Sequence, residues 1–148
     1  MPMESPLCGY LHAVEQALEA EGVWTDRWHC VARHRQGQRE HVGIIEWCDN
    51  NPANTHAWPI GLALARFPDA WVWTGEVYDG WPERYEELPL VRWADPGDVA
   101  LVVRHLLAHG PKAIPSPASP RRWSGADEAQ AALDELAESP HAYDTFYP

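Results

Sequence analysis

The chain has 148 residues, and its 22 Asp and Glu outnumber 11 Lys and Arg, so the formal net charge is −11. The length fits one domain, and the 45% of hydrophobic residues exclude disorder of the whole chain. No apolar run reaches the ~18 residues that cross a membrane, and residues 1–6 lack the pattern of a signal peptide. We therefore expect a cytoplasmic protein with no membrane partner.

The first predicted element is a helix that begins at Ser5-Pro6 and ends at Gly22. Ser is a common N-cap, Pro suits the first helical position, and Gly is a frequent stop. The apolar residues between them recur on one helical face, which should pack on a flat apolar layer; they are Leu7, Leu11, Val14 and Leu18.

After this helix the apolar period changes to two, which predicts about five antiparallel strands. Pro89 cannot donate to a ladder, so the last strand should lie at an edge. Short connections between consecutive strands favour a meander. The predicted strands are 28–33, 41–47, 58–65, 71–78 and 88–93.

A second helix is predicted from Asp95 to Pro111. Asp95 can cap it, Pro96 suits its first position, and Gly110 stops it. The resulting fold class is α+β in two layers, with the N- and C-terminal helices on one face of the sheet and the other face partly open.

The composition changes after Gly110, where four prolines occur within ten residues, from Pro111 to Pro120. We therefore predict a core domain over 1–110 and an appendage over 111–148 that comprises a Pro-rich linker, a short helix and an aromatic tail. The tail either folds back onto the domain, which is the favoured alternative, or docks on a partner; its aromatic residues are Tyr143, Phe146 and Tyr147.

Four segments carry a family resemblance. They are Gly9-Tyr10-Leu11-His12-Ala13-Val14, the pair Ile60-Gly61-Leu62-Ala63-Leu64 and Ala70-Trp71-Val72-Trp73, and Asp95-Pro96-Gly97-Asp98-Val99-Ala100. Over Gly9 to Gly110 the chain resembles a small family of uncharacterised actinobacterial proteins that share a domain of unknown function. That family has no established activity, so the resemblance supports the fold and implies no chemistry.

Patterns typical of metal or cofactor sites are weak. His105 and His109 have the i, i+4 spacing of zinc ligands, but no H-E-x-x-H motif is present, and helix-end histidines are the favoured interpretation. Three cysteines without a C-x-x-C pair predict thiols and no zinc ribbon. A further group of possible ligands lies near the first hairpin but lacks the spacing of a metal site; it comprises His29, Cys30, His34, His41 and Cys48. We therefore expect no metal and no cofactor.

The best enzyme-like pattern is three carboxylates at strand ends, Glu46, Glu76 and Asp79, near Trp47 and Trp73. Paired carboxylates perform acid–base chemistry, and carboxylates beside Trp platforms also suit sugars. Solvated surface acids are the favoured interpretation. A small enzyme or a carbohydrate-binding domain is therefore the alternative function, and the sequence leans away from catalysis.

The leading hypothesis is a non-enzymatic binding protein with a basic protein partner. The charge of −11 opposes nucleic acid, although Arg33, Arg35 and Arg39, and separately Arg121-Arg122, form small basic patches. An inhibitor or immunity-type protein against a basic toxin or nuclease fits this charge by analogy.

Nine Trp residues supply candidate contact residues for such a partner, although most of them should fill the core. Trp, Tyr and Arg dominate hot spots at interfaces. The candidates in turn-rich or edge contexts are Trp81, Tyr85, Trp93 and Trp123.

Overall fold

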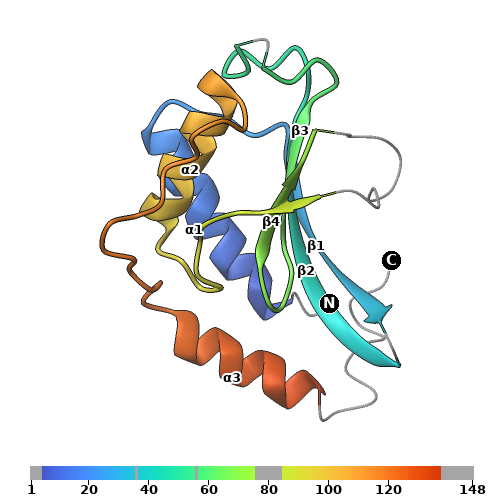
Figure 1. The fold of residues 1–148 in the computed structure, drawn as a ribbon. Helices are drawn as coiled ribbons and strands as arrows, with labels where there is room; N and C mark the ends of the chain where they lie inside the picture. The colour runs from blue at the N-terminus through green and yellow to red at the C-terminus, as the bar shows by residue number, and fades with distance from the viewer. Residues whose placement is uncertain (1–4, 36, 56, 76–84, 138–148) are drawn as a thin grey trace.

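The computed structural model describes residues 5–35, 37–55, 57–75 and 85–137. Within them, three helices and five strands follow one another in the chain (Figure 1). Their bounds are α1 Pro6–Ala20, β1 Arg27–Arg35, β2 Gln38–Trp47, β3 Leu62–Arg66, β4 Trp71–Thr74, β5 Glu86–Glu87, α2 Pro96–His109 and α3 Ala126–Ala137.

Helices α1 and α2 begin where the capping residues predict. The Ser5 hydroxyl accepts a hydrogen bond from the Leu7 N–H at 3.3 Å, and the Asp95 carboxylate accepts one from the Gly97 N–H at 3.0 Å. At the other end of α2, Gly110 has φ 77°, a conformation that favours glycine. Local chemistry therefore fixes both helices.

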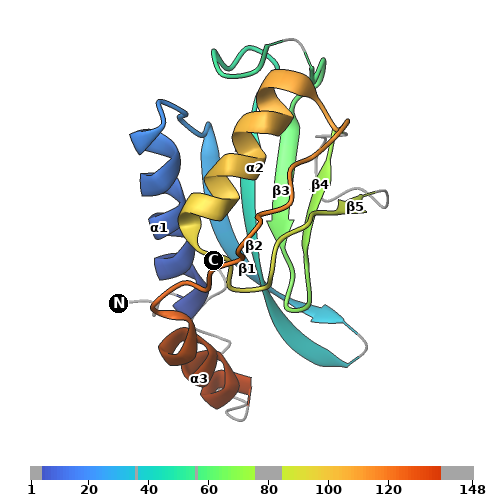
Figure 2. The same ribbon diagram turned by 60° about the vertical axis from the view of Figure 1, so that its left-hand side comes forward.

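The five strands form one antiparallel sheet in the order β1-β2-β3-β4-β5, which confirms the predicted α+β fold with its meander. Alternation along the strands sends one set of side chains toward α1 and α2, which cover that face (Figures 1 and 2). In this register Leu64 lies between Ile45 and Trp73, and all three contribute to the main core.

A glycine lets α1 approach the sheet closely. A Cβ atom on Gly43 of β2 would lie 2.8 Å from Cδ1 of Leu11, which is closer than real Cβ contacts. Leu11 is fully buried at this point. The missing side chain at Gly43 therefore sets the distance between α1 and the sheet.

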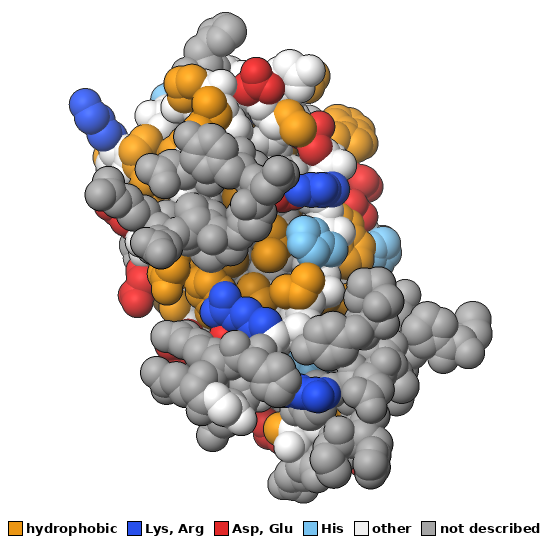
Figure 3. Space-filling view, turned by 90° about the vertical axis from the view of Figure 1, so that its right-hand side faces the viewer, with side chains coloured by type: hydrophobic (Ala, Val, Ile, Leu, Met, Phe, Trp, Pro, Cys, Tyr) orange, Lys and Arg blue, Asp and Glu red, His pale blue; other side chains and the backbone are white. Residues whose placement is uncertain are grey.

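The opposite face of the sheet carries a second, smaller apolar cluster, and none of the described helices covers it. Its buried members are Val42, Ala65, Phe67 and Val72. The Arg33 guanidinium lies 4.5 Å from the centre of the Phe67 ring. Figure 3 shows hydrophobic side chains on this face with basic and histidine side chains among them.

The fifth strand differs from the prediction. Residues 88–93 do not form a strand; the edge strand is β5, which pairs with Val72 and Trp73. The Leu88 N–H still donates to the Trp71 carbonyl at 2.8 Å, and the chain then leaves the ladder at Pro89, which has no N–H to donate. The hydrophobic pattern of 88–93 instead reflects packing against other segments.

The third and fourth strands also differ in their ends. Strand β3 begins at Leu62, because Trp58 turns into the core, where its indole N–H donates to the Leu106 carbonyl at 2.7 Å. Strand β4 ends at Thr74, and residues 76–78 of the predicted strand lie outside the described residues.

Residues that follow the Pro-rich linker pack against the preceding unit. Arg122 forms a bridge with Ala94, the Trp123 N–H donates to the Trp93 carbonyl at 2.7 Å, and α3 packs on α1. The predicted aromatic tail lies outside the described residues, so whether it folds back or docks on a partner stays a prediction.

A buried polar pair joins the start of α1 to the sheet. The Ser5 hydroxyl lies 3.0 Å from Nδ1 of His41, and both residues are buried. Burial lowers the pKa of His41 below its ordinary value, because the charged imidazolium loses its hydration.

The 1–110 boundary gives the first prediction. A chain that ends at Gly110 should still fold, since its helices and sheet are complete, but it loses the contacts of Trp123 and α3. We expect a cooperative melt at a temperature lower by roughly 10 °C, measured by circular dichroism. A truncated chain without a cooperative transition would place the boundary elsewhere, and an unchanged melting temperature would mean that residues 111–137 contribute nothing.

The second prediction concerns His41. Because its pKa is lower in the folded state, the unfolded state binds the proton first, so this contribution is complete above about pH 6.5 and declines as the pH falls below it. The free energy of unfolding should therefore fall from about pH 7.5 to about pH 5.5 more steeply in the wild type than in His41→Gln. Equal slopes in urea titrations of the two proteins would contradict this.

Candidate functional site

Tyr10 lies at the centre of a cluster of aromatic rings. The Tyr10 ring centre lies 6.1 Å from that of Trp71, 5.1 Å from that of Trp93 and 5.0 Å from that of Trp123. Its hydroxyl donates to the Ala94 carbonyl at 2.6 Å, and burial raises the pKa of that hydroxyl well above its ordinary range. The cluster thus joins α1, β4, the segment before α2 and the segment before α3.

Trp93 does not lie on the surface, where a residue that contacts a partner would have to be. It is only 2% exposed, and its indole N–H donates to Gln130 Oε1 at 3.0 Å. The ring stacks on Trp123, with centres 5.9 Å apart. Trp93 therefore belongs to the core, because the contacts that bury it come from distant segments that edge-strand reasoning does not include.

Of the other predicted contact residues, Tyr85 and Trp123 pack against different clusters. Tyr85 is 43% exposed and packs against Phe67 of the second apolar cluster. Trp123 is half-buried beside Trp93. Trp81 lies outside the described residues.

The predicted Trp–carboxylate cluster is not assembled by the described residues. Glu46 forms an ion pair with Arg27, whereas Trp47 points to the opposite, helix-covered face of the sheet and is fully buried. Alternation along β2 causes this separation. Glu76 and Asp79 lie outside the described residues.

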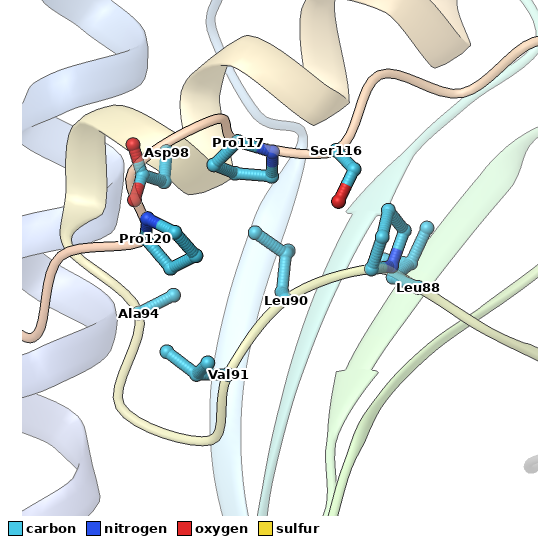
Figure 4. A pocket seen from close by; sticks show the side chains of 9 residues that line it. Leu88, Leu90, Val91, Ala94, Asp98, Ser116, Pro117 and Pro120 are labelled. Atoms are coloured by element: carbon cyan, nitrogen blue, oxygen red, sulfur yellow. The ribbon is translucent and has the colours of Figure 1, made fainter.

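A hollow lies between the segment before α2 and the Pro-rich segment after it (Figure 4). It has a volume of about 320 Å³, and we call it the Asp98 hollow. Leu90 and Val91 face it from the first segment, and Pro117 and Pro120 from the second. Its walls are thus mostly apolar.

One carboxylate lines the Asp98 hollow. Asp98 stands in the first turn of α2, where the helix dipole favours a negative charge, and it is 9% exposed. Its Oδ2 accepts from the Arg121 N–H at 3.1 Å. This bond joins α2 to the segment that forms the opposite wall.

A second hollow, the arginine hollow, has a volume of about 340 Å³ and shares Val91 and Pro120 with the first. Val91 is 46% exposed at this shared boundary. The remaining lining residues are Arg92, Trp93, Arg121 and Arg122. Three of the chain's ten arginines therefore line one depression of an acidic protein.

A fourth arginine lies beneath the arginine hollow. Arg66 is 1% exposed, its Nε donates to the Arg92 carbonyl at 3.1 Å, and its Cζ lies 4.1 Å from the centre of the Trp93 ring. Burial lowers the pKa of Arg66 to about 10, so the guanidinium is still charged at pH 7. Among the described residues no carboxylate forms an ion pair with it, and its Nη2 has no hydrogen-bond partner.

The sequence contained a signal for Arg66 that the predictions did not use. Leu62, Leu64 and Arg66 alternate on β3, so all three face the core. An arginine in such a series is a buried charge, which needs a physical explanation. No comparable signal exists for the hollows, because their walls come from segments far apart in the sequence.

The outer face of α3 is acidic. The helix contains no Lys or Arg, and its four carboxylates are exposed; they are Asp127, Glu128, Asp134 and Glu135. Asp127 pairs with Arg122, and Asp134 accepts from Gln130 at 2.9 Å. Positions seven apart recur on one helical face. Asp134 therefore lies two turns after Asp127 on the same face, and Glu135 lies two turns after Glu128.

The histidine and cysteine patterns form no metal site in the described part of the chain, where no group of three His, Cys, Asp or Glu is arranged for a metal ion. The His105 and His109 rings are 5.2 Å apart, and Nε2 of His105 contacts the Lys112 carbonyl at 2.6 Å. In β1, alternation sends Cys30 toward the helices and His29 away from them.

Comparisons with protein-family models, curated proteins and solved structures find no match to this chain. Membership of the actinobacterial family therefore stays a prediction from the four sequence segments. None of the described helices combines the length and the apolar character that a membrane crossing requires.

The positions of Trp93 and Tyr85 give a matched prediction. Trp93→Ala should lower the free energy of unfolding by about 3–5 kcal/mol, because it removes a buried ring and leaves a cavity. Tyr85→Ala should cost less than about 1 kcal/mol, since the side chain is 43% exposed and its loss leaves no closed cavity. Urea unfolding of both variants measures this difference, and similar costs would contradict the assigned burial.

Proposed function

We propose that this chain is a non-enzymatic binding protein that engages a basic protein partner through the outer face of α3. The observation that carries the proposal is the set of four exposed carboxylates on a helix without a basic residue. Only Asp127 of the four has an ion-pair partner among the described residues, namely Arg122. The other three carboxylates are available to lysines or arginines of a partner.

The charge of the whole chain supports the same partner. A net charge of −11 attracts a basic protein and increases its association rate, within a screening distance of about 8 Å at physiological salt. The same charge repels the phosphates of nucleic acid.

An aromatic residue adjoins this acidic face. Trp123 is half-buried and stands three residues before α3 begins, so part of its ring borders the helix. Trp123 is joined directly to the start of α3, because its carbonyl accepts a hydrogen bond from the Ala126 N–H at 3.1 Å. We assign Trp123 the role of anchor, because Trp at the centre of an interface often dominates its lifetime.

An inhibitor or immunity-type role, in which the partner is a basic toxin or nuclease, is the specific form of this proposal. Its support is the charge alone, by analogy. A cytoplasmic location belongs to the same proposal, and it is supported by Cys8, Cys30 and Cys48, all of which are described and carry thiols.

The proposal predicts where charge removal weakens binding. Glu128→Gln/Glu135→Gln removes two charges from the outer face of α3, and the matched control Glu86→Gln/Glu87→Gln removes two exposed charges from β5. With a lysine decapeptide as the probe, we expect the dissociation constant to rise about fivefold for the α3 variant and less than about twofold for the control. Fluorescence anisotropy of the labelled peptide measures both.

Equal weakening by the two variants would overturn the assignment to α3, because both change the net charge by the same amount. Their melting temperatures are measured alongside, so that loss of folding is distinguished from loss of a contact.

A further inference from the structure

The buried charge of Arg66 needs an interaction that the described residues supply only in part. A guanidinium removed from water is costly unless hydrogen bonds and an opposite charge compensate it. Within the described part of the chain, Arg66 donates one hydrogen bond, to the Arg92 carbonyl, and lies over the face of the Trp93 ring. Both of these contacts are to residues that line the arginine hollow, so the uncompensated charge lies directly beneath it.

The three arginines that line the hollow are only weakly engaged. Arg121 contacts Asp95 at 3.4 Å, and Arg122 pairs with Asp127; both arginines are exposed, so these ion pairs are of small energy. Arg92 donates to the Pro68 carbonyl at 3.4 Å, and no described carboxylate forms an ion pair with it. The hollow therefore presents N–H donors to a bound anion.

The adjoining Asp98 hollow indicates which chemical group the ligand carries behind its anionic head. Both hollows are lined by Val91 and Pro120, so one ligand can extend from the arginine hollow into the Asp98 hollow. The Asp98 hollow offers the apolar side chains of Leu88, Leu90 and Pro117 to an aliphatic chain. The Asp98 carboxylate repels an anionic head group, which orients the head toward the arginines.

We propose that the two hollows together bind an aliphatic carboxylate, with its head group on Arg92 and Arg121 and its chain along Val91 and Leu90. A guanidinium fork donates two parallel hydrogen bonds to one carboxylate, so the geometry of the donors suits this group. A doubly charged phosphate is disfavoured, because Asp95, Asp98 and Asp127 lie beside the arginines. This site adjoins the proposed α3 interface, because Arg122 of the hollow pairs with Asp127 of α3, but its ligand and its head-group residues are different.

The test is a titration with octanoate, observed through the indole N–H signals of the full chain in ¹⁵N nuclear magnetic resonance. We expect saturable shifts for Trp93 and Trp123, no saturable shifts with octanol, and none with inorganic phosphate. Saturation by octanol with equal affinity would overturn the role of the arginines, and saturation by inorganic phosphate would overturn the choice of ligand. The absence of shifts with octanoate would overturn the site.

Two matched variants locate the head group. Arg121→Gln removes an exposed arginine from the hollow and keeps the backbone N–H that bonds Asp98. The control Arg104→Gln removes an exposed arginine of α2, which pairs with Glu21 at the end of α1. We expect Arg121→Gln to raise the dissociation constant of octanoate about tenfold, which is the effect of losing one charge-assisted hydrogen bond. Arg104→Gln should leave the dissociation constant unchanged. Equal affinities in the two variants would overturn the assignment of the head group.

Discussion

The contacts of the Tyr10 ring hold together segments that are far apart in the chain. The ring contacts Trp71 of the sheet, Trp93 before α2 and Trp123 before α3, and its hydroxyl bonds Ala94. Edge-to-face aromatic pairs contribute about 0.5–1.5 kcal/mol each beyond the area that they bury. Because Trp93 lines the arginine hollow and Trp123 leads into α3, the cluster fixes both proposed surfaces.

The two proposed surfaces separate charges of opposite sign. The acidic residues of α3 face outward without a basic residue in the helix, whereas three arginines line the hollow between the segment before α2 and residues 120–122. Arg66 extends that basic region into the core, where the Trp93 ring is its main neighbour. A net charge of −11 therefore describes the chain as a whole, and each surface has its own sign.

Local signals predicted the helices and most of the sheet. Ser5, Asp95 and Gly110 determine helix ends through contacts within a few residues, and alternation along β1 and β2 reflects burial on one face. The segment 88–93 has the hydrophobic pattern of a strand but does not form one, because its apolar residues pack against residues far along the chain. Trp93 and the hollows depend on the same tertiary contacts, which no local pattern encodes.

The aromatic cluster joins the segment before α3 to the core, and a double-mutant cycle of Trp93→Leu and Trp123→Leu tests this role, with the free energy of unfolding measured in urea. We expect the two losses not to be additive, with a coupling of about 1 kcal/mol for stacked rings in contact. Losses that add to within about 0.3 kcal/mol would contradict it, because the two rings would then contribute independently to stability.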